Sequence, residues 1–354
     1  MFQFDFGIEE DVEPSTQTVV AVPEVVQLEP FAELSVSRLL DALPPLISYS
    51  PLSIPLPSDR KNVTLARRDL FDARFQLISE GRDDDPSSET TAPTSALEFL
   101  DAPSDLVPGV YEGGLKTWEC SLDLVGYLDG LKDSTNLSFS NKRILEVGCG
   151  TAIPSVYLLY SLFCAESKAN TNLHFQDYNV SVLELITFPN IILAWYMSPA
   201  SAEYRAAASD DPAEHPPADP ILAGELPIIP SLKSAFTASL AKLAITLVFS
   251  SGSWESLTTH LDVKYDIVLT SETIYRTQAL PALIHLLRQA CADSNPLCLV
   301  AAKVLYFGVG GGVSEFIEAL KSKIMVDKGC SGRVEPVWER KVGVGRKIMR
   351  IEWE

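Results

Sequence analysis

The chain has 354 residues, of which 46% are hydrophobic, and it carries a formal net charge of -19. This length fits one large domain, or one domain with extensions, and the composition allows a sizeable core. The negative charge argues against direct binding to nucleic acid or to an anionic membrane, because both need a basic surface. It favours a basic partner through long-range attraction, although the same charge also serves solubility alone.

Cysteine usage and the N-terminus point to a soluble intracellular protein. The 6 cysteines form no CxxC pair and have no histidine cluster beside them, so neither a metal site nor a disulfide framework is expected. The opening sequence MFQFDFGIEED lacks the basic segment and apolar core of a signal peptide. The long apolar stretches are interrupted by Lys242 and Lys303, so no membrane span is expected.

Two stretches are rich in proline and small polar residues. Residues 1–105 include the run RDDDPSSETTAPTS, which predicts a partly disordered N-terminal extension ahead of a domain over 106–354. Residues 198–234 have a similar composition inside that domain, and they predict a flexible inserted loop.

From residue 113 the hydrophobic pattern predicts strands alternating with helices. Apolar residues near helical spacing predict an amphipathic helix over 115–131. An apolar strand, a glycine turn and a helix follow at 142–163, and a second strand ends in HFQDYN at 174–179. Residues 181–197 predict the next helix.

The second half of the chain supplies the remaining strands. Residues 245–254 predict a third strand running into a turn, 264–275 a fourth and 296–307 a fifth. The end of the chain reads as two facing strands, over 334–343 and 346–354. Because strands alternating with helices form a parallel sheet with covered faces, we expect a Rossmann-like α/β fold with an antiparallel last strand.

The glycine turn is the first candidate for a ligand site. Gly148 and Gly150 follow an apolar strand, where the backbone must turn tightly and let a ligand approach. The third glycine of a dinucleotide site is replaced by Ile153, so pyrophosphate binding is not supported. Glu146 favours a cationic ligand by charge attraction, and Asp177 ends the next strand, where a carboxylate accepts hydrogen bonds from ribose hydroxyls. The pattern suits a nucleoside carrying a sulfonium amino acid, although any strand–helix turn can use glycine.

Five sequence stretches together resemble one known family. These stretches are GGLKTWECSLDLVGYL (113–128), ILEVGCG (144–150), FQDYN (175–179), YDIVLTSETIY (265–275) and AAKVLYFGVGGG (301–312). They are similar to the eukaryotic protein-histidine N-methyltransferases, which belong to the seven-strand class I methyltransferases that use S-adenosyl-L-methionine. The resemblance implies methylation of a histidine of a large-subunit ribosomal protein at the distal (tele) ring nitrogen.

The resemblance also implies which residues bind the cofactor. The helix before the sheet would line it with Thr117, Trp118, Glu119, Cys120 and Ser121. Gly148 would lie under the methionine part, and Gln176, Asp177 and Tyr178 beside the ribose. Gly252, Ser253 and Trp254 would flank the adenine, and Ser271 would close the pocket. Ser253 departs from the acidic residue expected in the family's turn.

Candidate catalytic residues follow the fourth and fifth strands. Glu272 leaves the end of a strand, where open α/β sheets bind ligands, and it is our candidate acceptor for the N–H of a target histidine. Tyr275 or Tyr306 would pack on the imidazole ring. The run Gly308–Gly312 predicts either a loop that folds over a peptide or a plain turn. Trp118 suits a cation–π contact with a sulfonium, or simply the core.

Other functions stay open at this point. A protein-lysine methyltransferase of the same superfamily shares several of these motifs, and a non-catalytic cofactor-binding adaptor for a basic ribosomal protein would share the charge. A small-molecule methyltransferase is a further alternative. We expect a monomer that binds a basic protein substrate, in the cytoplasm and, by resemblance alone, in the nucleus.

Overall fold

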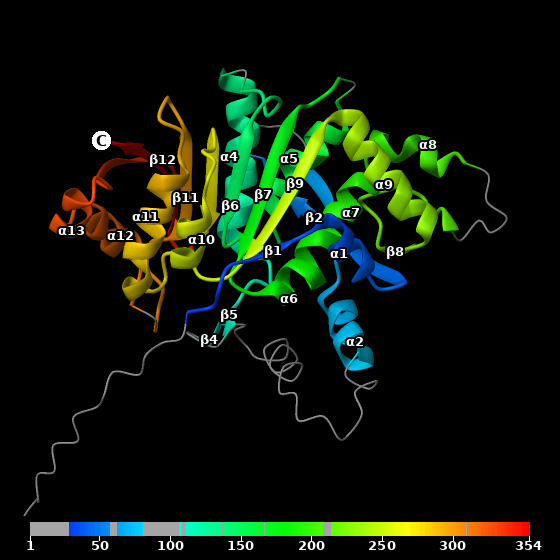
Figure 1. Cartoon of the computed structure of the whole chain (residues 1–354), viewed down its shortest axis with the longest axis horizontal. Coiled ribbons are helices and arrows are strands. Elements are labelled where there is room, and N and C mark those ends of the chain that lie inside the picture. The colour runs from blue at the N-terminus through cyan, green and yellow to red at the C-terminus, as the bar shows by residue number, and fades with distance from the viewer. Residues whose placement is uncertain are drawn as a thin grey trace, which may run out of the picture.

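The computed structural model describes residues 28–56, 62–80, 106–107, 111–135, 137–165, 167–207, 214–308 and 310–354. Its centre is an eight-stranded sheet of order β1-β9-β7-β6-β10-β11-β13-β12 (Figure 1). The parallel strands of this sheet are β6 (Arg143–Val147), β7 (Thr171–Asp177), β9 (Ile245–Ser251), β10 (Ile267–Ser271) and β11 (Leu297–Lys303).

The C-terminal pair of strands is antiparallel, as predicted. β13 (Arg346–Trp353) lies between β11 and β12 (Gly332–Arg340) and runs antiparallel to both. The Rossmann-like α/β prediction is therefore confirmed, with seven strands in the expected arrangement and one additional strand, β1.

The sheet divides the core into two halves because successive side chains of a strand point to opposite faces. Ile144 of β6 belongs to the larger apolar cluster, whereas its neighbour Leu145 belongs to the smaller one. The larger cluster packs against α4 (Glu119–Thr135), α5 (Ile153–Phe163), α7 (Phe188–Tyr196) and α9 (Pro230–Leu243). The smaller cluster packs against α10 (Trp254–His260), α11 (Leu280–Ala290) and α12 (Val313–Leu320), and α13 (Lys323–Asp327) follows α12.

Part of the predicted N-terminal extension belongs to the fold instead. β1 (Ala32–Leu34) pairs antiparallel with β9 and forms an edge of the main sheet. After α1 (Val36–Asp41), the strands β2 (Leu46–Ile54) and β3 (Val63–Arg68) form a second sheet, which α2 (Leu70–Glu80) follows. The prediction is wrong for these residues, because proline and polar residues interrupt apolar patches that nevertheless pack. Residues 1–27 and 81–105 lie outside the described residues.

The predicted inserted loop also contains ordered elements. It forms η2 (Pro199–Ser201), α8 (Ala202–Arg205) and β8 (Gly224–Pro227), and β8 pairs with β2. Tyr204 packs on Trp195 with ring centroids 5.8 Å apart. The prediction of a flexible loop is therefore wrong for 198–207 and 214–234, because aromatic contacts and strand pairing fix them. Residues 208–213 are outside the described part.

The helix predicted over 181–197 is present with one irregularity. It consists of α6 (Val180–Val182), the π-helical turn η1 (Leu183–Thr187) and α7. Thr187 in the π turn donates to the carbonyl of Gly150 at 2.7 Å, so the irregular turn holds the glycine turn of the candidate site.

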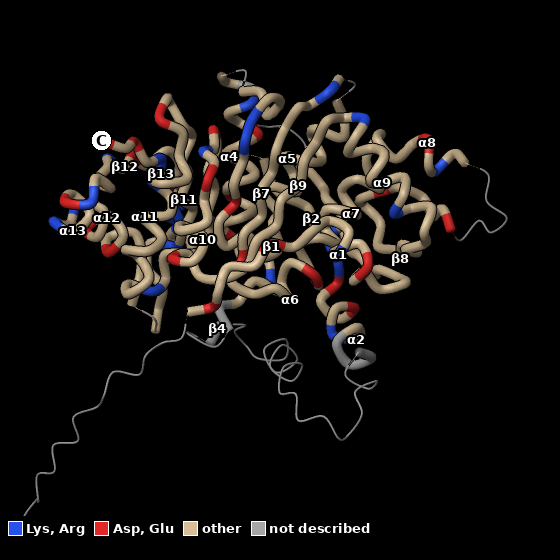
Figure 2. The backbone as a smooth tube through the Cα atoms, in the orientation of Figure 1, with Lys and Arg blue, Asp and Glu red and all other residues tan. Residues whose placement is uncertain are grey.

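Charged residues are dispersed over the described chain (Figure 2). Within the described ranges, no single helix is long and apolar enough to span a membrane. The bent pair Val180–Tyr196 and Pro199–Arg205 passes that test by length and composition, and its central residues Phe188–Tyr196 are buried in the core. The described residues contain no group of metal-ligating side chains that could hold an ion.

Candidate functional site

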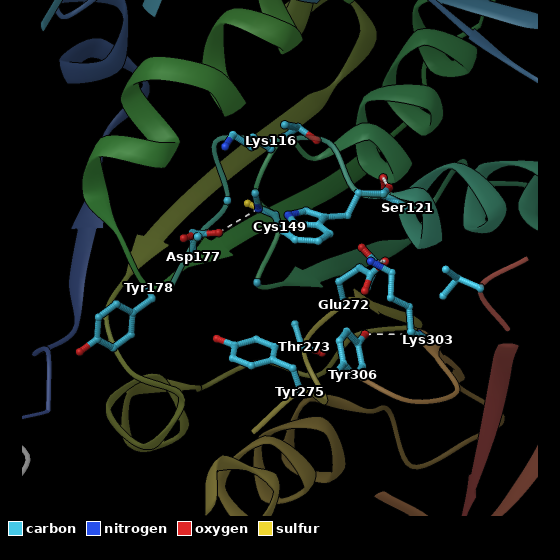
Figure 3. A pocket seen from close by; sticks show the side chains of 18 of the residues that line it. Lys116, Ser121, Cys149, Asp177, Tyr178, Glu272, Thr273, Tyr275, Lys303 and Tyr306 are labelled. Atoms are coloured by element: carbon cyan, nitrogen blue, oxygen red, sulfur yellow. Dashed lines mark hydrogen bonds and ion pairs between the residues drawn. The ribbon is translucent and has the colours of Figure 1, made fainter. Parts of the chain in front are cut away.

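A pocket of about 350 Å³ lies at the carboxyl ends of the parallel strands (Figure 3). Open α/β sheets bind ligands at this edge, because the loops that follow the strands leave a crevice there. Eleven of the residues predicted from the sequence line the pocket: Trp118, Ser121, Gly148, Gly150, Asp177, Tyr178, Trp254, Ser271, Glu272, Tyr275 and Tyr306.

The glycine turn after β6 needs its glycines for both backbone and space. Gly148 has φ of 59° and Gly150 φ of 52°, in the left-handed region that favours glycine. A Cβ on Gly148 would lie 2.7 Å from the Thr273 methyl group, and one on Gly150 would lie 3.2 Å from the Gly114 backbone. A side chain at Gly148 would therefore collide with Thr273, and one at Gly150 would press on the Gly114 backbone.

Asp177 and Gln176 hold this turn in place from β7. The Asp177 carboxylate accepts from the Gly150 amide at 2.8 Å and from the Asn179 amide at 3.1 Å, and it faces the pocket. Gln176 is fully buried and does not line the pocket. It accepts from the Gly148 amide and donates to the Gly252 carbonyl, so it joins two loops of the site.

Glu146 lies behind the pocket wall rather than on its surface. Its side chain is buried and accepts from the Ser155 amide at 3.0 Å, at the start of α5. Burial raises the pKa of Glu146 to about 7, although the Ser155 bond opposes the change. Glu146 is not among the residues that line the pocket. The prediction that its carboxylate contacts a cationic ligand directly is therefore wrong.

The helix predicted over 115–131 begins later, at Glu119, because the residues before it form the pocket wall. Gly113, Gly114 and Lys116 line the pocket and are not among the residues predicted from the sequence. Their signal was the paired glycine at 113–114, whose second member has φ of 106°.

Three predicted residues of this segment support the wall instead of lining it. Thr117 accepts from Arg67 at 3.2 Å. The Cys120 amide donates to Glu272 at 3.3 Å, and Glu119 pairs with Lys303 at 3.3 Å. Of the five residues predicted from Thr117 to Ser121, Trp118 and Ser121 line the pocket.

The loop after β9 presents one residue to the pocket. Trp254 lines it, whereas Ser253 caps α10 by accepting from the Ser256 amide. Gly252 packs against the Pro30 carbonyl, where a Cβ would approach to 2.4 Å. Ser253 and Gly252 thus shape the loop that presents the Trp254 ring.

The loop after β10 contains the candidate catalytic residues. Glu272 has φ of 60°, an unfavourable backbone conformation for a residue with a side chain, and such strain clusters at functional sites. Its Oε1 lies 3.8 Å from Lys303 Nζ, and its Oε2 has no hydrogen-bond partner among the described residues. Tyr275 lines the same pocket, with its ring centroid 6.3 Å from that of Tyr306.

Lys303, at the end of β11, is a pocket residue that the sequence reading missed. Its ammonium lies 4.5 Å from the centroid of the Trp118 ring and between the carboxylates of Glu119 and Glu272. The sequence reading treated it as an interruption in an apolar stretch. Its position at the carboxyl end of a predicted strand was the signal that could have found it.

Tyr306 completes this cluster. Its hydroxyl accepts from the Lys303 amide at 3.3 Å. Burial, and then the charge of Glu272, raise the pKa of Tyr306 well above its ordinary value, so this phenol stays protonated at neutral pH. Figure 3 shows Glu272, Lys303 and Tyr306 on one side of the pocket and Asp177 and Tyr178 on the other.

The glycine run after Tyr306 forms a turn fixed against the pocket loop. The Tyr306 amide donates to the Gly311 carbonyl at 3.0 Å, and a Cβ on Gly311 would lie 2.3 Å from the Tyr275 carbonyl. The other lining residues absent from the prediction are Cys149, Thr151, Thr273, Leu305, Phe307 and Val344.

These residues fit S-adenosyl-L-methionine. The open glycine turn admits a ligand against the backbone, and Asp177 offers carboxylate oxygens where ribose hydroxyls would donate. Trp118 and Trp254 add aromatic faces for a sulfonium and a base.

Comparison with known proteins identifies the family. No family model matches the chain. Histidine protein methyltransferase 1 of Schizosaccharomyces pombe is 33% identical over 326 residues, covering 90% of this chain and 84% of that protein. Histidine protein methyltransferase 1 of Saccharomyces cerevisiae is 35% identical over 274 residues, covering 73% of this chain and 69% of that protein.

Solved structures are more distant. The ribosomal protein L11 methylase of Lactobacillus delbrueckii subsp. bulgaricus is 11% identical, with a TM-score of 0.35 over 69% of this chain and 83% of that chain. That similarity is too low to carry an argument. The two fungal relatives match most of this chain, and this chain covers more than two thirds of each of them. The chain therefore belongs to the histidine protein methyltransferase family.

Proposed function

We propose that this chain transfers a methyl group from S-adenosyl-L-methionine to the tele nitrogen of a histidine in a large-subunit ribosomal protein. The observation that carries the proposal is one pocket in which the glycine turn, Asp177, Trp118 and Glu272 meet. Family membership supports histidine over lysine. The ribosomal target and the choice of ring nitrogen rest on the sequence resemblance alone.

On this proposal the cofactor would lie across the carboxyl ends of β6 and β7. Asp177 would accept from the ribose, and the Gly148–Gly150 backbone would lie under the amino-acid part. Trp254 would contact the base. The bound cofactor supplies an electrophilic methyl group on a sulfonium, and the protein's part is to align the nucleophile with it and to exclude water.

Histidine needs little help to become a nucleophile. Its ordinary pKa of about 6.5 leaves most of it neutral at pH 7, whereas a lysine with a pKa near about 10.4 must first lose a proton. The attacking nitrogen must carry the lone pair, so the other nitrogen must carry the proton. Glu272, which lines the pocket, would accept that N–H and later its proton.

The charge of the chain supports a basic partner. A net charge of -19 attracts a cationic protein and disfavours a direct complex with RNA. We also propose that the enzyme is a monomer and that it resides in both the cytoplasm and the nucleus.

The test is to incubate the full chain with purified large-subunit ribosomal proteins and methyl-labelled cofactor, and to map the label. We expect label in one protein, recovered as tele-methylhistidine after hydrolysis. Methyllysine would reassign the enzyme, and pros-methylhistidine would overturn the choice of nitrogen. An absence of label although the folded chain binds the cofactor would overturn the ribosomal target.

A further inference from the structure

An exposed apolar surface adjoins the mouth of the pocket. We name it the mouth patch and define it by Val304, Leu305, Phe307 and Val344, which are 36%, 44%, 82% and 47% exposed. The exposure of Phe307 is the largest among the large hydrophobic residues of the described chain. Such a contiguous apolar surface marks an interaction site more often than chance exposure does.

The mouth patch is continuous with the site. Leu305, Phe307 and Val344 line the pocket, and at the same time they are 44%, 82% and 47% exposed. A ligand that leaves the pocket on this side therefore runs directly over the patch.

Two loops build the patch, and they are held together. The Val304 amide donates to the Gly345 carbonyl at 2.8 Å, which joins the end of β11 to the turn between β12 and β13. The Gly310 amide donates to the Tyr306 carbonyl at 3.3 Å, which closes the turn that carries Phe307. The two loops that carry the patch are thus joined to each other by a backbone hydrogen bond.

The chemistry of the patch selects its occupant. No charged residue occurs from Val304 to Ser314, and the charges that flank the second loop, Lys341 and Arg346, pair with Glu339 and Asp123. Apolar side chains of a partner gain free energy when they are buried on this patch. The chain's family acts on protein, so polypeptide must cross the pocket mouth when a histidine enters.

We propose that the mouth patch binds an apolar side chain of the substrate protein close to the methylated histidine. This inference rests on the proposed function, because it assumes that a histidine occupies the pocket. An extended polypeptide advances about 3.3 Å per residue, so the apolar residue would lie within about three residues of the histidine. The patch would then help to choose which histidine of a protein is modified.

The test uses two fluorescent peptides with one central histidine, one flanked by leucine and the other by serine, and otherwise identical. Binding to the full chain saturated with S-adenosylhomocysteine is measured by anisotropy, and methyl transfer is measured separately. The wild type should bind the leucine peptide about tenfold more tightly, as expected for burial of one apolar side chain. The double variant Phe307→Ser and Val344→Ser should bind both peptides equally.

A matched control uses Ile324→Ser and Val326→Ser on α13, which are 61% and 53% exposed and do not line the pocket. This control should keep the leucine preference. The inference is overturned if the wild type shows no preference for the leucine peptide, or if the patch variant keeps that preference. It is also overturned if the wild type is a dimer that dissociates in the patch variant, because the patch would then bind a second copy of the chain. Leucine-selective binding without methyl transfer would support the patch while counting against the proposed reaction.

Discussion

Glu272 combines strain, burial and an oxygen without a described partner at the end of a central strand. Its left-handed backbone, with φ of 60°, directs a carboxylate into a pocket where Cys120 and Lys303 already engage one oxygen. A carboxylate held in this way can fix the tautomer of a neutral imidazole, because it accepts a hydrogen bond and donates none.

Replacing Glu272 by glutamine tests that role directly. The amide keeps the size of the side chain but presents a donor as well as an acceptor, so we expect turnover on a histidine substrate to fall about a hundredfold. Binding of S-adenosylhomocysteine, measured by calorimetry, should change little. Turnover within a few fold of the wild type would show that Glu272 does not select the tautomer.

Lys303 is a positioning residue on this account. Its ammonium contacts the Trp118 ring and neutralises Glu272, so Lys303→Met should release both side chains. We expect kcat to fall about tenfold, the size of a cation–π contact, with a smaller change in KM. Lys303→Arg should restore much of kcat, whereas equal losses in the two variants would contradict an electrostatic role.

The raised pKa of Glu146 should make the free energy of unfolding depend on pH. Its pKa is raised from 4.5 to about 7 in the folded protein, so unfolding releases a proton between these values. Its contribution is therefore complete below about pH 4.5 and is lost as the pH rises to about 7, a change of about 3 kcal/mol. Buried His174, with its pKa lowered from 6.5 to about 4, has the opposite slope: its contribution is complete above about pH 6.5 and is lost as the pH falls to about 4.

The measurement is denaturant unfolding of the wild type and of Glu146→Gln across this pH range. The stability of the variant relative to that of the wild type should rise between about pH 4.5 and 7, since the opposing histidine is common to both. A difference that is constant with pH would show that Glu146 titrates normally in the fold.

At the scale of elements, the parallel strands and the glycine turn could be predicted from the sequence, because buried strands and turns leave local patterns. Gly148 and Asp177 were found in this way, and both line the pocket. Lys303 and the Gly113–Lys116 wall were not found, because a lysine at the end of an apolar strand and a pair of glycines are weak local signals, and only the folding of the chain brings them to the pocket. Cys120 and Gln176 lie near the site, but their roles are support behind the wall.

The glycine turn itself can be tested with a matched pair of variants. Gly148→Ala adds a methyl group beside Thr273 and strains a residue at φ of 59°, so affinity for S-adenosylhomocysteine should drop at least about tenfold. Gly130→Ala places the same methyl group on α4, where nothing lies within 4 Å, and should stabilise the helix by about 1 kcal/mol. Unchanged affinity in Gly148→Ala would place the ligand elsewhere.

At the scale of the whole molecule, residues 28–56 and 62–80 are part of the enzyme's architecture. The Arg68 guanidinium is buried and donates to Asp72, Gln76 and the Leu185 carbonyl, which ties β3 to the π turn beside the site. The sequence reading assigned this region to an extension, because its apolar patches are short and their partners lie more than a hundred residues away, as for Arg68 and Leu185.

Loss of this anchor should destabilise the whole fold. Arg68→Met leaves buried polar groups without their partner, and we expect the free energy of unfolding in urea to decrease by about 3 kcal/mol. Arg38→Met removes an exposed ion pair with Glu184 in the same region and should change it by less than about 1 kcal/mol. Equal decreases in the free energy of unfolding for the two variants would show that the buried Arg68 contacts do not stabilise the fold.

The most direct measurement is calorimetric titration of the folded chain with S-adenosylhomocysteine, for the wild type and for Asp177→Ala. We predict saturable heat with one site per chain in the wild type, and clearly weaker binding when the ribose acceptor is removed. An absence of heat in the wild type, with the fold verified in the same sample, would contradict the assignment of this pocket.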